Sequence, residues 1–380
     1  MTKRRKRVLF ALAFRVVVGL LLVGFLARCG SVIQGEYAAD GKPFDFADPP
    51  CSAVSGEPPP TSVDIRYTGS GGVYIGWGGD ALMFGPFFSN PGLLTAAFGK
   101  FRSDEERVRR HLHGIPLSKV RAIVTGHSHY DHIGDVPLVA RDHIPKAALY
   151  TNAAGTNMLS AYPDLRARLH TVQAGRPIAI TDANGAEVIR VYPVLSDHAP
   201  PVCRCRRWPC EYANGPVTKP WTKPFHEHWA RDFGGGETYA YVIDLIRDGE
   251  VRYRIYYNDA AAQHPLGIPD AAAIAQRPYD IAILCMASYD FVDGYPDVLL
   301  SSIKPRHIII SHYENFFSRS EGHWRFAPLL TNGKANAFFG RLKRIDYQND
   351  PLPAAKKPCG VSTDRWTMPV PDAQVLFGPN

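Results

Sequence analysis

The 380-residue chain lacks an internal repeat, and outside its first 28 residues it lacks an excess of charge of either sign. Residues 1–28 contain seven Lys or Arg and no Asp or Glu, and removing these seven from the total of 43 leaves 36 basic against 36 acidic residues. Nucleic-acid-binding domains usually carry a basic footprint. The neutral body therefore argues against nucleic acid as a partner.

The chain also lacks low-complexity segments. Its 33 Gly and 32 Pro have no period, which excludes a collagen-like chain and predicts many turns and long loops. Hydrophobic residues make up 45% of the sequence and aromatic residues 11%, amounts that are ordinary for a protein that buries a core. The composition favours a globular domain.

The N-terminal basic cluster precedes an apolar stretch. Residues 3–7 are all Lys or Arg, and residues 8–27 are apolar except for Arg15. This pattern is typical of an export signal or of a membrane anchor with its basic end inside. Leu26-Ala27-Arg28-Cys29 resembles a lipoprotein cleavage site in which Arg replaces the small residue before the cysteine. Lipidated, cleaved and uncleaved forms remain open, and all three predict an exported, cell-envelope protein.

Six further cysteines follow Cys29, and in an oxidising compartment they can form disulfides. They are Cys51, Cys203, Cys205, Cys210, Cys285 and Cys359. Three of them crowd the segment 203–210, without the paired Cys-x-x-Cys spacing of a structural zinc site. We expect disulfides or free thiols there.

Three parts follow one another along the chain: the signal or membrane anchor (1–29), a Pro-, Gly- and Ser-rich tether (30–61) and one folded domain (62–380). Hydrophobic patterns predict strands at 63–67, 72–77, 81–84, 120–124, 189–195, 239–246, 252–257, 280–285 and 307–311, and helices at 104–113, 136–142, 155–169 and 295–303. Ser103 and Glu106 form a capping-box pattern for the first of these helices. This mixture predicts a layered α/β domain with two sheets inside.

The most informative motif is His127-Ser128-His129-Tyr130-Asp131-His132, directly after the predicted strand 120–124. Imidazole nitrogens and carboxylate oxygens are ligands that zinc prefers. The chain contains only 14 His, so a chance cluster is improbable. A surface histidine patch that binds metal adventitiously is the alternative. We interpret the motif as part of a metal site.

The motif resembles the His-x-His-x-Asp-His signature of the metallo-β-lactamase superfamily, and the resemblance covers most of residues 63–320. It implies a four-layer αββα fold, with two mixed β-sheets sandwiched between helices, and a metal-dependent hydrolase with a dinuclear site. The implied ligands are His127, His129 and His198 for one metal, Asp131, His132 and His312 for the other, and Asp259 as a bridge.

The three distant residues, His198, Asp259 and His312, each follow an apolar run, and strand ends at one sheet edge can bring distant residues together. Singly, each is more often an ordinary loop or capping residue. The turn 68–72 and the loop 85–88 depart from the family, which usually has a histidine in the turn and Asp-Pro in the loop. We expect weaker hydrogen-bonded support for the ligands as a result.

The resemblance also implies a chemistry, in which Asp131 orients a metal-activated water for hydrolysis. Because position 129 is His and not the Glu of the di-iron branch, zinc is expected, with Mn²⁺ or Fe²⁺ as alternatives. The residues after His312 resemble the branch containing N-acyl-phosphatidylethanolamine phospholipase D and ascorbate-phosphate lactonase-like proteins. This implies an ester-type substrate, with a phosphodiester or lipid headgroup ahead of a lactone, thioester or β-lactam. An inactive, membrane-anchored binding protein is the alternative.

The segment 199–236 follows His198 and is rich in aromatic residues. It carries His226, His228 and Trp229. One hypothesis makes it a lid over an apolar or lipid substrate, with His226 or His228 as an accessory acid. The other makes it a disulfide-tied surface loop without a catalytic part.

Overall fold

The computed structural model describes residues 58–200, 215–318, 324–328, 330–346, 349–355 and 359–378. The predicted export segment 1–29, the tether up to residue 57 and the cysteines Cys29, Cys51, Cys203, Cys205 and Cys210 lie outside these ranges. Within them, no helix combines the length and the apolar character needed to cross a membrane. Of the cysteines that are described, Cys285 is a buried free thiol and Cys359 is disulfide-bonded.

The strands of the described chain are β1 Val63–Gly69, β2 Gly72–Trp77, β3 Asp80–Phe84, β4 Val120–Val124, β5 Ala148–Thr151, β6 Leu169–Thr171, β7 Ile178–Thr181, β8 Glu187–Ser196, β9 Thr238–Arg247, β10 Glu250–Tyr257, β11 Ile281–Cys285, β12 His307–Ser311, β13 Gly360–Ser362, β14 Trp366–Pro369 and β15 Gln374–Phe377. The helices are α2 Leu93–Phe98, α3 Glu105–Leu112, α4 Tyr130–Ile133, α5 Val136–Leu138, α6 Ala153–Leu159, α7 Ala271–Gln276, α8 Asp297–Ile303 and α9 Asn332–Arg344.

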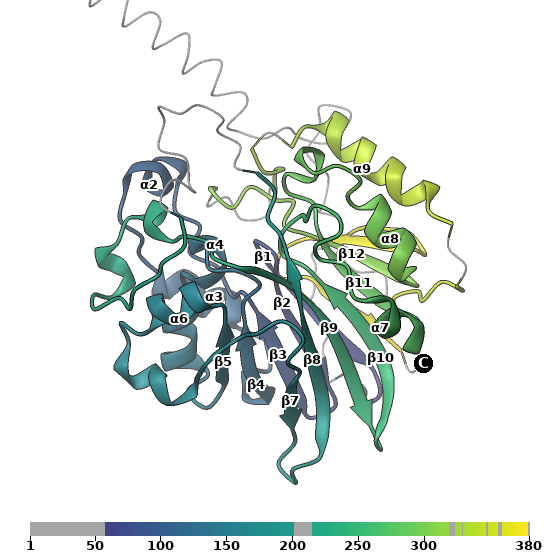
Figure 1. Ribbon diagram of the computed structural model, residues 1–380, viewed down its shortest axis with the longest axis horizontal. Helices are drawn as coiled ribbons and strands as arrows, with labels where there is room; N and C mark the ends of the chain where they lie inside the picture. Colours follow the sequence, from purple (N-terminus) through teal and green to yellow (C-terminus); the bar gives the residue numbers. More distant parts are fainter. Residues whose placement is uncertain are drawn as a thin grey trace, which may run out of the picture.

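The strands of the described ranges form two mixed sheets (Figure 1), one of seven strands in the order β15-β1-β2-β3-β4-β5-β6 and one of eight in the order β13-β14-β12-β11-β10-β9-β8-β7. In the first sheet, β3 to β6 are parallel and the remaining pairs are antiparallel. In the second, β10, β11, β12 and β14 are parallel, whereas β7 to β10 alternate in direction. Long central strands such as β9 are buried almost throughout because both of their faces are covered.

Two hydrophobic clusters define the layers. The inner faces of the sheets share one core, to which the first sheet contributes Phe84 and the second Ile255, and α8 and α9 pack against that core through Leu300 and Phe338. Helices α3, α5 and α6 cover the outer face of the first sheet, where they pack against residues such as Met83. Figure 1 shows these two sets of helices on opposite sides of the paired sheets. The predicted four-layer α/β arrangement with two mixed sheets is confirmed.

The start of α3 differs from the prediction. Its N-cap is Asp104, whose side chain accepts a hydrogen bond from the Arg107 backbone N–H, so the Ser103 capping box is wrong. The Ser103 hydroxyl instead donates to the Gly134 carbonyl oxygen at 3.4 Å. Ser103 therefore contacts the C-terminal end of α4 and does not cap α3.

The candidate residues and the start of the described chain lie at opposite ends of the sandwich. β8, β10 and β12 run in the same direction. Their last residues, Ser196, Tyr257 and Ser311, therefore lie at the same end of the second sheet. The described chain begins at the other end, where the Pro60 carbonyl accepts a hydrogen bond from Arg247 beside the β9–β10 turn. The candidate residues that follow these strands therefore gather at one end, away from residue 60.

Candidate metal centre

The seven predicted ligands lie together at this end of the sandwich. They form three overlapping groups, in each of which one potential ligand atom from every residue lies within 4.8 Å of the others. The groups are His127, His129 and His198; His127, His132 and Asp259; and Asp131, His132 and His312. His127 and His132 each belong to two groups, so the three form one continuous centre that could hold metal ions.

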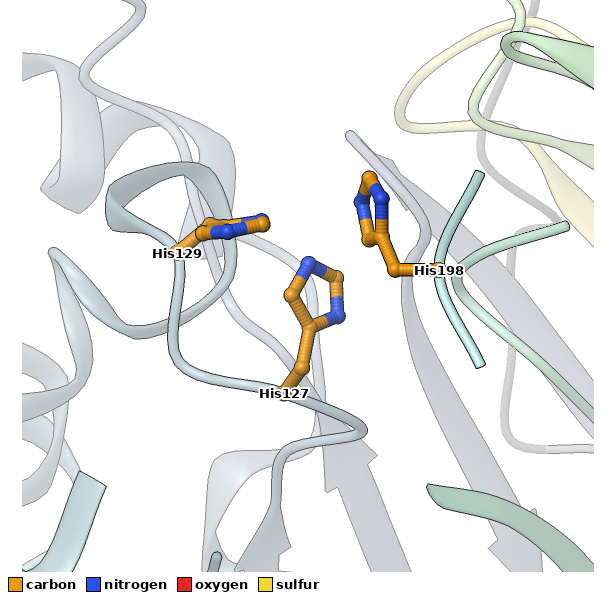
Figure 2. Close-up of side chains that lie close together, drawn as sticks. All are labelled: His127, His129 and His198. Carbon is orange, nitrogen blue, oxygen red and sulfur yellow. The ribbon is translucent and has the colours of Figure 1, made fainter. Parts of the chain in front are cut away.

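The first subsite consists of three imidazoles that face a common space (Figure 2). The ring centroid of His127 lies 4.5 Å from that of His129 and 4.8 Å from that of His198. The centroids of His129 and His198 are 4.9 Å apart. Nε2 of His127 is buried without a hydrogen-bond partner. A buried, unsatisfied nitrogen is costly, and a divalent metal ion at this point would satisfy it.

Asp259 lies between the two ends of the centre and is 1% exposed. Its Oδ1 is 3.1 Å from Nδ1 of His127, and its Oδ2 is 3.4 Å from Nδ1 of His132. The Gly126 backbone N–H donates to Oδ2 at 3.2 Å. The two oxygens thus face different histidines, as a bridging carboxylate requires.

The second subsite is built around Asp131. Its Oδ2 lies 3.4 Å from Nε2 of His132 and 3.3 Å from Nε2 of His312. The Nδ1 atoms of both histidines are buried and make no hydrogen bond. One carboxylate and two imidazoles are again a donor set that fits a divalent cation.

Burial keeps most of these imidazoles neutral. It lowers the pKa of His129 and His132 well below the ordinary value, and neighbouring imidazoles lower it further. Burial and the neighbouring His127 lower the pKa of His198 to about 4. At His312 burial is outweighed by the hydrogen bond and charge of Asp131, so its pKa is raised. A neutral imidazole is the form that binds metal.

Glycines allow the backbone to approach the centre closely. A Cβ at Gly126 would lie 2.3 Å from Oδ1 of Asp259, and one at Gly235 would lie 2.6 Å from Nε2 of His129. Gly71, in the left-handed region at φ +77°, would place a Cβ 3.1 Å from that of Asp259. Our sequence analysis did not identify these positions, although Gly126 directly precedes the motif and Gly235 lies in a run of three glycines.

The two segments that depart from the family have their own hydrogen-bonded support. In the glycine turn, the Ser70 backbone N–H donates to Glu314 Oε1 at 2.5 Å, and the Gly71 carbonyl accepts from the Tyr257 hydroxyl at 2.9 Å. In the loop after β3, the buried Asp135 carboxylate accepts from the backbone N–H of Phe88 at 2.7 Å and of Ser89 at 2.8 Å. Both segments are therefore fixed without the residues usual in the family.

Ser128 and Asn152, which follow strands β4 and β5 of the first sheet, hold the segment 234–236 next to His129 through hydrogen bonds. The Asn152 amide donates to the Gly235 carbonyl at 2.6 Å, and the hydroxyl of Ser128 donates to the same oxygen at 2.9 Å. The end of the 199–236 loop therefore reaches the metal centre through backbone, at Gly235.

The predicted substrate-loop residues make other contacts. His226 is exposed, and His228 stacks on Trp221 with ring centroids 3.6 Å apart. Trp229 is 39% exposed. The guanidinium carbon of Arg231 lies 5.0 Å from the centroid of the Trp229 ring. None of the contacts described for these three residues involves the seven candidate ligands. The structure therefore does not bring them together with the centre.

Comparison with solved structures finds weak likenesses to metallo-hydrolases. Igni18, a metallo hydrolase from the archaeon Ignicoccus hospitalis, shares 15% identity at a TM-score of 0.46, over 83% of this chain and 99% of that one. The metallo-beta-lactamase fold protein YhfI from Bacillus subtilis shares 12% at 0.38, over 66% and 86%. An isothiocyanate hydrolase from Delia radicum gut bacteria shares 14% at 0.40, over 76% and 97%. Because these TM-scores are below 0.5, function is inferred below from the site itself. No protein-family model and no curated protein matches the chain.

The close approach at Gly126 predicts that Gly126→Ala loses bound metal while β4 still folds, because the added methyl group displaces Asp259. Gly79→Ala is the matched control, since a Cβ at Gly79 meets nothing within 4 Å. Elemental analysis gives the metal content, and thermal unfolding of the metal-free proteins reports on the fold. Full metal content in Gly126→Ala would contradict the placement of Asp259.

Proposed function

We propose that the protein is a metal-dependent hydrolase with a dinuclear centre, in which His127, His129 and His198 hold one metal ion, Asp131, His132 and His312 hold the other, and Asp259 bridges them. The observation that carries this proposal is that three donor groups overlap through His127 and His132, because a single ion would use only one group. All seven residues are buried except His198, which is half-buried. The all-nitrogen-and-oxygen donor set favours Zn²⁺, with Mn²⁺ or Fe²⁺ as alternatives.

Two divalent ions, when bound, lower the pKa of a shared water and stabilise the negative charge that develops as the substrate bond breaks. We assign the catalytic role to Asp131. Its carboxylate lies within 3.4 Å of both histidines of its own subsite, and its charge also acts on His198 in the other. From this position it orients the attacking water and accepts its proton.

The proposed substrate carries an ester-type bond, with a phosphodiester or lipid headgroup ahead of a lactone, thioester or β-lactam. Two features support this order: the predicted membrane segment near residues 8–27, and the sequence Tyr313-Glu314-Asn315 after His312, which resembles the phospholipase-like branch. A second candidate is a binding protein that keeps the fold without turnover. A complete, buried donor set has no use in such a protein, which favours the enzyme.

We further propose that the protein is exported and membrane-attached in the cell envelope. The uninterrupted basic cluster before residues 8–27 supports this location. The disulfide at Cys359 also supports it, since structural disulfides are typical of oxidising compartments.

The purified protein is expected to contain close to two equivalents of divalent metal, as a bridged two-ion site requires. Asp259→Asn removes one of the two charged bridging oxygens and is expected to lose both ions. His226→Ala, an exposed residue, is expected to lose neither. Elemental analysis decides, and unchanged metal in Asp259→Asn would remove Asp259 from the bridging position.

The reaction is tested with bis-aryl phosphodiesters, acyl lactones, thioesters and a chromogenic cephalosporin. We expect phosphodiesters to be hydrolysed fastest and Asp131→Ala to lose about 100-fold or more of the turnover, because general-base and orienting groups contribute at least that much. Faster metal-dependent cleavage of the cephalosporin would overturn the substrate order. A protein with two bound ions and no activity on any class would support the binding protein.

Membrane attachment is tested by fractionating cells that express the wild type and Cys29→Ala. Continued membrane association of the variant with an intact N-terminus indicates a spanning anchor, whereas release of soluble protein indicates cleavage. Mass spectrometry of the N-terminus separates these cases. Wild-type protein found soluble in the cytoplasm would refute export.

A further inference from the structure

Glu314 is a buried carboxylate, 2% exposed, that belongs to none of the three candidate ligand groups. It follows His312 by two residues, directly after β12. Its Oε2 accepts a hydrogen bond from the hydroxyl of Tyr67, and its Oε1 accepts one from the Ser70 backbone N–H. A carboxylate is stable in such a dry environment only when donors satisfy it, so these two hydrogen bonds fix its position.

The first hydrogen bond connects Glu314 to the backbone of His312. The phenol oxygen of Tyr67, which is fully buried, accepts the His312 N–H at 2.8 Å while its own hydrogen is donated to Glu314. His312 has φ +52°, in the left-handed region that a residue with a Cβ rarely adopts. A strained residue of this kind persists only where its surroundings determine its conformation. Here the determining contact is Tyr67, and Tyr67 is held by Glu314.

The second hydrogen bond connects Glu314 to the turn between β1 and β2. Ser70, also in the left-handed region at φ +48°, lies beside Gly71 in the turn between β1 and β2. A Cβ at Gly71 would be 3.1 Å from that of Asp259 and 3.3 Å from Cε1 of His132. The turn therefore packs directly against two candidate ligands, and its position depends in part on Glu314.

We propose that Glu314 is a positioning residue of the second metal subsite: through Tyr67 it fixes the backbone of His312, and through Ser70 it fixes the turn that packs on Asp259 and His132. This inference rests on the proposed dinuclear centre. Glu314 touches neither metal nor substrate, and acts on affinity through the geometry of three ligands. None of the interactions described joins His127, His129 or His198 to Glu314 or Tyr67. A change at Glu314 therefore acts on this subsite indirectly, through the shared Asp259, and more weakly than on the second subsite.

The test is a Zn²⁺ titration of the metal-free, full-length protein in detergent, following the affinity of each equivalent by calorimetry. In Glu314→Ala we expect the second equivalent to bind at least tenfold more weakly. We expect the first equivalent to lose less affinity, because its subsite shares only Asp259 with the affected residues. Glu314→Gln keeps an oxygen acceptor and is expected to recover part of that loss. Tyr67→Phe removes the hydrogen bond to the His312 backbone and one of the two donors to Glu314, but keeps the hydrogen bond from Ser70. It is therefore expected to weaken the second equivalent by less than Glu314→Ala.

Glu237→Gln is the matched control, because the exposed Glu237 also accepts a hydrogen bond from a tyrosine, Tyr239, at 2.9 Å. It is expected to leave both equivalents unchanged. Wild-type affinity for both equivalents in Glu314→Ala would overturn the inference. An equal loss of affinity for both equivalents in Glu314→Gln and Tyr67→Phe would also overturn it, because that result would indicate a general structural role. If Glu314→Ala does not fold, shown by thermal unfolding of the metal-free protein, these two variants decide alone. A wild type that binds fewer than two ions would instead refute the proposed function.

Discussion

The desolvated carboxylate of Asp259 is the constraint on which the geometry of the centre depends. At 1% exposure its charge must be balanced by donors or cations, and it has the Gly126 backbone and the imidazoles of His127 and His132 around it. Its surroundings leave no room for side chains, which explains glycine at 126 and at 71. Because Asp259 follows β10, in the interior of the second sheet, while His127 follows β4 in the first, the carboxylate also joins the two halves of the sandwich.

The sequence was sufficient to predict the central strands for one physical reason. Strands such as β9 and β12 are covered on both faces, so they appear as apolar runs. The candidate ligands His198, Asp259 and His312 were implied by the resemblance to the metallo-β-lactamase superfamily, and their places after apolar runs supported that choice. The structure brings His198 and Asp259 to His127, and His312 to Asp131 and His132. Short strands with three or four residues, such as β6 and β13, were not predicted, because hydrophobic periodicity needs more residues to be detected and tertiary pairing decides their conformation.

The remaining features depend on contacts between distant parts of the chain. Tyr67 and Glu314 are 247 residues apart, and no local pattern relates them. Gly235 lies against His129, but in the loop 199–236 the sequence analysis had singled out His226 and His228 instead. Those histidines illustrate the converse difficulty: a histidine near a metal-binding segment has the same appearance in sequence whether it faces the metal or, as His228 does, stacks within its own loop.

The position of Pro60 has a consequence for whatever is joined to the chain on its N-terminal side. Pro60 lies beside the β9–β10 turn, and β1 then runs the length of its sheet to the glycine turn next to Asp259. A ten-residue strand such as β9 is roughly 33 Å long. Whatever is joined to the chain at residue 60 therefore lies about one strand length from the centre, at the opposite end of the sandwich.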